Sequence, residues 1–190
     1  MPPIATFYFD LASPIAYLAA ERVTTVLPAA VDWQPVLARD LPGAEDFQAF
    51  RCREEELAFR EQIERAAARQ GLQPVVWPEA FPFDSELAVR VALYARGLGK
   101  VAAFALAAFR QAFAAGRSLA DEDNVLVAAA ACEMHPRAVL AGAHQRSLAE
   151  RLGAATAEAA RAGVTDVPAV AFGGAVHVGA DALERTAAAA

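Results

Sequence analysis

Ser13 and Pro14 are the first residues of the chain whose types and order suggest chemistry. Serine is favoured just before the first turn of a helix and proline at the first helical position, so the pair predicts a helix start. The N–H groups of such a helix end, with the Ser13 hydroxyl as a further donor, can stabilise an anion such as the thiolate of a bound thiol. The alternative interpretation is that Ser13 is a plain helix cap.

Two positions near the other end of the sequence also have two interpretations. Pro168 follows Val167 and precedes an apolar segment. We predict a cis Val167–Pro168 bond, and the alternative is an ordinary loop proline. Asp181 begins the last helical segment, where the helix dipole favours a carboxylate whether or not that carboxylate binds a ligand.

Cysteine and histidine usage argues against two kinds of chemistry. Cys52 and Cys132 lie 80 positions apart, so the chain has no Cys-x-x-Cys pair for disulfide exchange. His135, His144 and His177 have no metal-ligand spacing with one another or with the cysteines. A disulfide oxidoreductase is therefore disfavoured, and we predict no metal site.

The charge balance and the hydropathy pattern limit the partners. The sequence has 17 Lys and Arg against 23 Asp and Glu, a net charge of −6, and its basic residues are scattered. A nucleic-acid-binding surface needs basic residues gathered on one face. The longest stretch without a charged residue, 167–180, is shorter than the roughly 20 apolar residues of a membrane span. Because the first residues also lack a signal-peptide pattern, we expect a cytoplasmic protein that binds neither nucleic acid nor membrane.

The elements that must position Ser13 form a βαβ unit. Residues 4–9 are short, apolar and aromatic, which is typical of a buried strand. An apolar helix is predicted over 15–27, and a second strand over 31–37. Two strands joined through a helix are expected to lie parallel.

A long stretch without predicted strands follows this unit. A charged helix is predicted over 47–70, with Glu–Arg pairs four positions apart, and three prolines predict an extended loop over 73–83. Further helices are predicted at 85–96, 101–115, 121–133, 136–152 and 154–162. We expect no strand between residues 39 and 152.

Strands return near the end of the sequence. Residues 169–172 and 175–178 read as two strands, joined by Gly173 and Gly174. Glycine tolerates positive φ, so this pair suits a two-residue hairpin turn. A last helix is predicted over 181–189.

The order of elements predicts an α/β fold of the thioredoxin-like class. A large all-helical domain is inserted between the βαβ and ββα halves of that fold. We predict a thioredoxin-like domain made of residues 1–38 and 153–190, and an inserted helical domain made of residues 39–152.

Four motifs match a known family in the same order along the chain. They are Phe7-Tyr8-Phe9-Asp10-Leu11-Ala12-Ser13-Pro14-Ile15-Ala16-Tyr17-Leu18-Ala19, Phe81-Pro82-Phe83-Asp84-Ser85, Gly163-Val164-Thr165-Asp166-Val167-Pro168 and Gly179-Ala180-Asp181-Ala182-Leu183. In these residues the chain resembles the 2-hydroxychromene-2-carboxylate isomerase family and the related kappa-class glutathione transferases. The resemblance implies glutathione as the cofactor, a small aromatic substrate and a homodimer.

The resemblance also implies roles for individual residues. Ser13 corresponds to the catalytic serine at the glutathione sulfur, and the backbone of Val167, before a cis Pro168, faces the cysteinyl portion. Asp181 corresponds to the partner of the γ-glutamyl amino group, and Ala180 stands where kappa-class proteins have a serine. The implied glutathione site is therefore Ser13, Val167, Pro168, Ala180 and Asp181.

The chain departs from the family pattern in ways that bear on glutathione binding. Ala182 stands where the family usually has arginine, and residues 38–46 lack the lysine and the Gly-Asn pair expected there. Arg39 is the geometric candidate for the glycyl carboxylate.

Three functions follow from the resemblance. The first is a glutathione-dependent cis–trans isomerase, which acts on an aromatic-degradation intermediate by reversible addition of the thiolate. The second is a kappa-like glutathione transferase or peroxidase, which consumes the thiol. The third is a non-catalytic binding protein in which the departures have removed useful affinity for glutathione.

Overall fold

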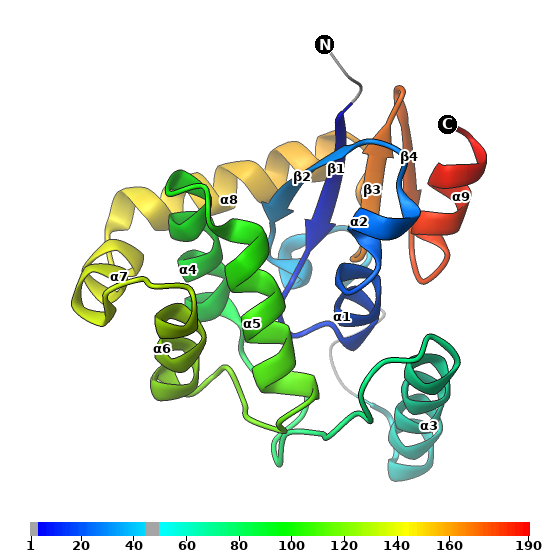
Figure 1. Ribbon diagram of the computed structural model, residues 1–190, viewed down its shortest axis with the longest axis horizontal. Coiled ribbons are helices and arrows are strands. Elements are labelled where there is room, and N and C mark those ends of the chain that lie inside the picture. The colour runs from blue at the N-terminus through cyan, green and yellow to red at the C-terminus, as the bar shows by residue number, and fades with distance from the viewer. Residues whose placement is uncertain (1–3, 45–49) are drawn as a thin grey trace.

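The computed structural model describes residues 4–44 and 50–190, and it contains a four-stranded sheet. The strands are β1 (Ile4–Phe9), β2 (Ala30–Pro35), β3 (Ala169–Phe172) and β4 (Ala175–Val178), in the spatial order β2-β1-β3-β4. β1 and β2 are parallel, and the other two pairs are antiparallel. The predicted thioredoxin-like α/β fold is therefore confirmed (Figure 1).

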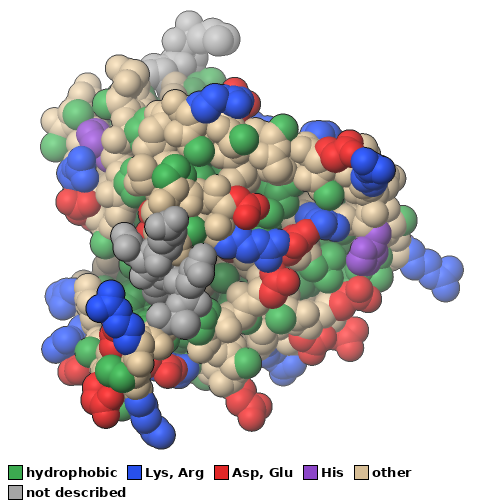
Figure 2. Space-filling view, turned by 180° about the vertical axis from the view of Figure 1, so that it is seen from behind, with side chains coloured by type: hydrophobic (Ala, Val, Ile, Leu, Met, Phe, Trp, Pro, Cys, Tyr) green, Lys and Arg blue, Asp and Glu red, His purple; other side chains and the backbone are tan. Residues whose placement is uncertain are grey.

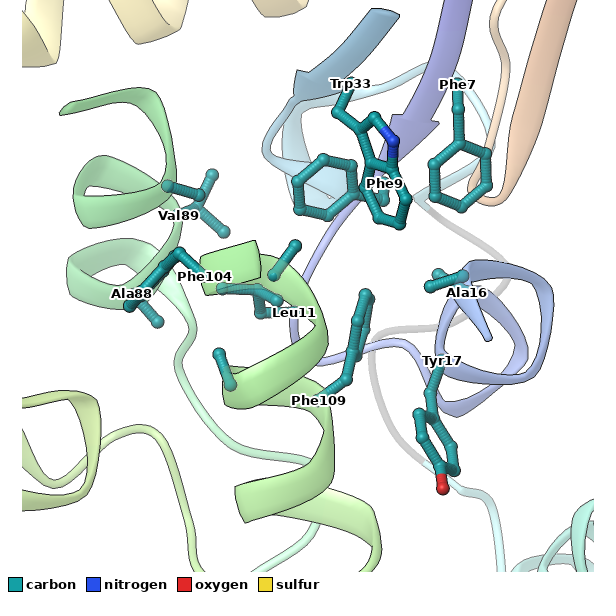
Figure 3. Close-up of a cluster of buried hydrophobic side chains, with 14 of the residues drawn as sticks. Phe7, Phe9, Leu11, Ala16, Tyr17, Trp33, Ala88, Val89, Phe104 and Phe109 are labelled. Atoms are coloured by element: carbon teal, nitrogen blue, oxygen red, sulfur yellow. The ribbon is translucent and has the colours of Figure 1, made fainter. Parts of the chain in front are cut away.

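One face of β1 carries two of the largest side chains of the core. Phe7 and Phe9 have no exposed surface, and both contact the edge of the Trp33 ring, with centroid distances of 5.1 and 5.7 Å. Phe109 of α5 (Val101–Phe113) lies 6.0 Å from Phe9 (Figure 3). Burial of one such side chain contributes about 1.5–3 kcal/mol, so these rings hold the helical region onto the sheet.

The other face of the sheet is covered by α8 (Arg146–Arg161). Ala159 of this helix belongs to a second buried cluster with Val36 and Val164, and the Tyr8 ring packs against that cluster. Because successive side chains of a strand point to opposite faces, β1 is fully buried on the face of Phe7 and Phe9 and half-buried on the face of Tyr8. This makes β1 the fixed support from which the following loop starts.

The helix predicted over 15–27 is interrupted. The structure has α1 (Pro14–Ala20) and α2 (Val23–Val26), separated at Glu21 and Arg22. The side chain of Arg22 forms an ion pair with Glu184, 2.5 Å away, and its carbonyl accepts from the Thr25 hydroxyl. These tertiary and local contacts interrupt the predicted helix at the two charged residues of a mainly apolar segment.

α3 (Arg53–Arg69) is shorter than the helix predicted over 47–70, and part of the difference lies outside the described residues. It stands apart from the sheet, below α1 in Figure 1. Aromatic contacts link it to the proline-containing loop, which is extended as predicted: Phe59 lies 6.3 Å from Trp77, and Trp77 lies 4.9 Å from Phe81.

The helical region contains no strand within residues 39–44 and 50–152, as predicted. Beside α5 it contains α4 (Glu86–Gly97), α6 (Glu122–Ala131) and α7 (Pro136–Ala143). The predicted starts and ends of α4, α5 and α6 differ from these bounds by only a few residues.

The predicted break between helices 136–152 and 154–162 is wrong. The chain breaks instead between α7 and α8, where Gln145 is extended, and Gly153 lies within α8. A glycine costs a helix interior only about 1 kcal/mol. The buried side chains Leu148, Leu152, Thr156 and Ala159 continue at helical spacing across it, and their packing outweighs that cost.

The domain boundary predicted at 152–153 consequently falls inside α8. One cluster of buried side chains includes Phe9, Phe109 and Leu183, which belong to different predicted domains. The sheet and the helical region thus share a core.

The hairpin between β3 and β4 has the predicted turn. Gly173 and Gly174 have φ values of 59° and 84°, which side chains with a Cβ rarely adopt. α9 (Ala182–Ala188) follows and packs against both strands of the hairpin. The strand predicted over 31–37 ends at Pro35, because the Leu37 N–H bonds to Thr156 rather than to the sheet.

Candidate functional site

A cavity of about 430 Å³ lies at the end of β1 from which the chain leaves toward α1. Its walls come from distant parts of the sequence: the loop and helix start after β1, the segment after β2, α3, the loop before α4, and the residues before β3. Ligand sites of α/β proteins commonly lie at the carboxyl ends of strands. The geometry therefore makes this cavity the candidate functional site.

Ser13 lies on this cavity and also caps α1. Its backbone is extended, with ψ at 112°, and its Oγ accepts a hydrogen bond from the Ala16 N–H at 3.1 Å. The Ser13 N–H donates to the Asp10 carbonyl oxygen at 3.1 Å. The cap interpretation is confirmed. A hydroxyl that accepts one hydrogen bond still has its own proton to donate, so capping does not remove Ser13 from chemistry in the cavity.

Val167 lines the same cavity, and its bond to Pro168 is cis as predicted. The structure therefore brings together two motifs that lie 154 positions apart. The Val167 N–H donates to Asp166 Oδ1 at 2.7 Å, whereas we expected it to be available to a ligand. The preceding side chain occupies this donor here, and the contact of the Val167 backbone with glutathione stays a prediction. The Pro168 carbonyl oxygen accepts from the Gly179 N–H at 2.9 Å.

Ala180 and Asp181 are not among the residues that line the cavity. Both are exposed, and the Asp181 carboxylate lies 3.6 Å from the Arg185 guanidinium. Asp181 occupies the cap position of α9, where the helix dipole favours its carboxylate as predicted, and its side chain makes no cap hydrogen bond there. Its role toward glutathione stays a prediction.

Arg39 lies on the rim of the cavity and is held by two carboxylates. Its Nη1 donates to Asp84 Oδ1 at 2.9 Å, and its Nη2 forms an ion pair with Glu86. Glu86 pairs in addition with Arg90. The Arg39 side chain is 49% exposed, so these surface pairs are worth at most about 1 kcal/mol each and a ligand carboxylate can replace one of them.

Asp10 is a cavity residue that sequence reasoning missed. It is 3% exposed, and its carboxylate accepts from the backbone N–H groups of Ala12 at 2.9 Å and Ala38 at 2.8 Å. Burial raises the pKa of this carboxyl group, and hydrogen bonds from Ala12, Ser85 and Ala38 oppose the rise. The available signal was a carboxylate directly after a strand, at the end of the sheet where sites gather.

Aromatic side chains form an apolar part of the wall. Phe59 of α3 and Phe83 of the loop before α4 both line the cavity, together with Pro82, whose bond to Phe81 is cis. Sequence reasoning did not single out Phe59, because nothing local distinguishes it from other apolar residues of a charged helix. This wall can hold a planar apolar group beside Ser13.

The cavity offers no thiol of its own. Cys52 is exposed and Cys132 is half-buried, and neither lines the cavity. Within residues 4–44 and 50–190, no group of three or more His, Cys, Asp and Glu side chains is placed to hold a metal ion.

Acidic and basic side chains alternate on the face shown in Figure 2, without a large area of one charge. In the described part of the chain, every helix is too short or too polar to cross a lipid bilayer.

Comparison with solved structures supports the fold described above. The chain is similar to a 2-hydroxychromene-2-carboxylate isomerase, with 20% identity, a TM-score of 0.85, and coverage of 98% of this chain and 93% of that chain. It is similar to a probable DsbA oxidoreductase from Streptomyces coelicolor, with 22% identity and a TM-score of 0.77. The match covers 98% of this chain and 88% of that chain. It is also similar to the cytosolic disulfide reductase DsbM from Pseudomonas aeruginosa with GSH, with 19% identity, a TM-score of 0.66, and coverage of 92% and 88%. At these identities the likeness concerns the fold alone.

The sequence itself gives a family. A search of curated proteins finds no match. The family described as DSBA-like thioredoxin domain matches residues 5–189, which is nearly the whole chain. The chain belongs to the family of DSBA-like thioredoxin domains.

Proposed function

We propose that this protein is a glutathione-dependent cis–trans isomerase of the 2-hydroxychromene-2-carboxylate isomerase type. It acts on an aromatic-degradation intermediate by reversible addition of the glutathione thiolate. The observation that carries the proposal is that Ser13 and Val167 line one cavity of about 430 Å³ that contains no cysteine. A disulfide oxidoreductase of this fold needs a protein thiol where this chain has the Ser13 hydroxyl.

Ser13 stabilises the thiolate of bound glutathione. The Ser13 Oγ accepts a hydrogen bond from the Ala16 N–H, and its own proton can be donated to the sulfur. The bond from Ala16 strengthens the bond from the hydroxyl to the sulfur. A free thiol has a pKa of about 8.5, and lowering it by about two units corresponds to about 2.7 kcal/mol of thiolate stabilisation. One charge-assisted hydrogen bond contributes about 1.5–3 kcal/mol, so the hydroxyl can account for most of that stabilisation.

The reaction leaves glutathione unchanged. The thiolate sulfur forms a bond to the conjugated carbon of the ring-opened form of the substrate, and the displaced π electrons move to its carbonyl oxygen. The former double bond is then single and rotates. When the electrons return, the carbon–sulfur bond breaks and the thiolate is released.

The other residues of the proposed site divide the ligands between them, and of these Asp181 lies outside the cavity lining. Phe59 and Phe83 form the apolar wall for the aromatic substrate. Arg39 binds the glycyl carboxylate of glutathione by exchanging its bond to Asp84, and Asp181 binds the γ-glutamyl amino group. The protein works in the cytoplasm as a homodimer. Light scattering on the purified protein tests the dimer.

Calorimetry with glutathione, followed by an isomerase assay on 2-hydroxychromene-2-carboxylate, tests the function. The expected result is saturable heat, and product formation that requires glutathione while the total thiol titre stays constant. A falling thiol titre would instead identify a transferase or peroxidase. No heat at millimolar glutathione would support the non-catalytic binding protein.

A further inference from the structure

We propose that Asp10 is the positioning residue of this site: its buried carboxylate fixes the Ser13 segment and the Arg39 segment relative to each other. The consequence for the thiolate at Ser13 rests on the function proposed above. The link between the two segments does not depend on that function, and it can be tested without any ligand.

Each carboxylate oxygen of Asp10 serves a different part of the cavity wall. Oδ1 accepts from the Ala12 N–H, next to Ser13, and Oδ2 accepts from the Ala38 N–H, next to Arg39. The Asp10 backbone also takes part, because its carbonyl oxygen accepts from the Ser13 N–H at 3.1 Å. One residue therefore fixes the turn before α1 and ties it to the segment after β2.

A third segment meets the same carboxylate. Ser85 is buried, and hydrogen bonding from its side chain lowers the pKa of Asp10, against the effect of burial. Ser85 lies between Asp84 and Glu86, the two residues that hold the Arg39 guanidinium. The Asp10 carboxylate is thus bonded to the sequence neighbours of Ser13 and of Arg39, and its pKa responds to the residue between both partners of Arg39.

The contacts require a carboxylate rather than an amide. Both oxygens accept from backbone N–H groups, and an asparagine offers only one side-chain acceptor. In Asp10→Asn the side-chain NH₂ faces one of these N–H groups, donor against donor. The variant keeps the side-chain volume and disrupts one of the two backbone links.

The variants Asp10→Asn and Asp10→Ala, assayed with glutathione, test the effect on the site. We expect kcat to fall about ten- to hundredfold, and the pKa of the bound thiol, followed by ultraviolet thiolate absorbance, to rise toward that of free glutathione. The glutathione dissociation constant should rise as well, because Asp10 fixes the segment of Arg39, the proposed partner of the glycyl carboxylate.

Thr156→Val is the matched control. Thr156 is buried on α8, and its Oγ1 accepts from the Leu37 N–H at 3.1 Å, one residue before Ala38. It does not line the cavity. The control should unfold more easily than the natural protein but keep kcat and the thiol pKa. Equal changes of kcat and of the thiol pKa in the control and in the Asp10 variants would overturn the proposal, because destabilisation of the fold alone would then explain those changes.

A measurement on the natural protein needs neither a variant nor glutathione. The amide protons of Ala12 and Ala38 should shift with pH along curves that share one midpoint, because both bond to one carboxyl group. Arg39, Asp84 and Asp166 are the other charged residues that line the cavity, and the hydrogen bonds of these two amides go to Asp10. Different midpoints would overturn the link between the segments. A shared midpoint without glutathione binding would support the link and reject only the proposed function.

Discussion

The Gly43 N–H donates a hydrogen bond to the Thr165 carbonyl oxygen, with 2.7 Å between nitrogen and oxygen. The contact joins the segment after β2 to the segment before β3, next to the cavity residues Ala44 and Asp166. A Cβ atom on Gly43 would lie 2.6 Å from the same oxygen. Two walls of the cavity therefore touch at a point where only glycine fits without a shift of the backbone.

Gly43→Ala should move these two walls apart. We expect a loss of about 1–3 kcal/mol in the free energy of unfolding, typical of forcing an extra methyl into a packed site, and weaker glutathione binding. Denaturant unfolding and calorimetry measure the two effects. Gly153→Ala is the control, because no atom lies within 4 Å of its added Cβ, and it should stabilise α8 by about 0.5–1 kcal/mol. Unchanged stability and binding in Gly43→Ala would contradict the argument.

Ser13→Ala should lower turnover far more than it weakens glutathione binding. Losing a hydrogen bond to a charged sulfur costs about 1.5–3 kcal/mol, or about ten- to hundredfold in kcat. The variant also loses the cap of α1, worth about 1 kcal/mol of stability.

Asp121→Ala separates these two effects of Ser13→Ala. Asp121 caps α6 through the Asp123 N–H at 3.0 Å and does not line the cavity. Asp121→Ala should lose about as much stability as Ser13→Ala and keep full turnover. Full activity in Ser13→Ala on a confirmed substrate would leave Ser13 as a helix cap only.

Asp181→Ala should have the opposite kinetic signature to Ser13→Ala. The proposed γ-glutamyl anchor is remote from the bond that rotates, so its loss should raise the glutathione concentration needed for half-maximal rate and leave the saturated rate nearly intact. Because Asp181 lies outside the cavity lining and near Arg185, Arg185→Ala is a useful companion variant. Arg185→Ala removes the ion-pair partner of the Asp181 carboxylate and should not weaken glutathione binding. An unchanged half-saturation value in Asp181→Ala would remove this residue from the site.

Asp166→Ala should strengthen glutathione binding. The Asp166 carboxylate accepts from the Val167 N–H, so a ligand carbonyl must displace it to reach that donor. It also places a negative charge on a cavity proposed to hold a thiolate. We expect roughly tenfold tighter binding, equivalent to about 1.4 kcal/mol. Asp166→Asn keeps an acceptor and loses the charge, so its affinity for glutathione should lie between that of the natural protein and that of Asp166→Ala. Weaker binding in both variants would show that Asp166 supports the site instead.

The stability of the protein should depend on pH through Asp10. Its pKa in the folded state is raised above the ordinary value of 3.8, chiefly by burial, so the folded chain holds this proton more tightly than the unfolded chain. The resulting stabilisation is fully present below the unfolded pKa and is lost as pH rises through the folded pKa. The difference in unfolding free energy between the natural protein and Asp10→Asn should therefore shrink over that window. Denaturant unfolding at a series of pH values measures it, and a difference that grows with pH would contradict the raised pKa.

The strands and the Ser13–Val167 site could be predicted because their signals are local or motif-based. Alternating burial in β1 and the turn at Gly173 and Gly174 follow from a few adjacent residues. The helix break at Gln145 could not be found in this way, since packing along α8 outweighs the local effect of Gly153.

Asp10 and Phe59 were missed for a related reason. The importance of Asp10 comes from bonds to Ala38 and Ser85, which the fold brings to it from distant segments. Phe59 becomes a wall residue only because α3 lies across the cavity from Ser13. Such roles depend on tertiary placement, which spacing along one helix or strand does not contain.

The pairing of β1 has a consequence for synthesis of the chain on the ribosome. β1 can pair with β2 soon after Pro35 emerges, but its other edge stays open until β3 has been added, because Phe7 lies opposite both Trp33 and Val170. An open apolar edge is a template for pairing with other nascent chains. The cavity is completed by the same late event, since Val167 directly precedes β3. A molecule that fills it can bind only the finished protein, and mass action then favours the completed fold over every earlier intermediate.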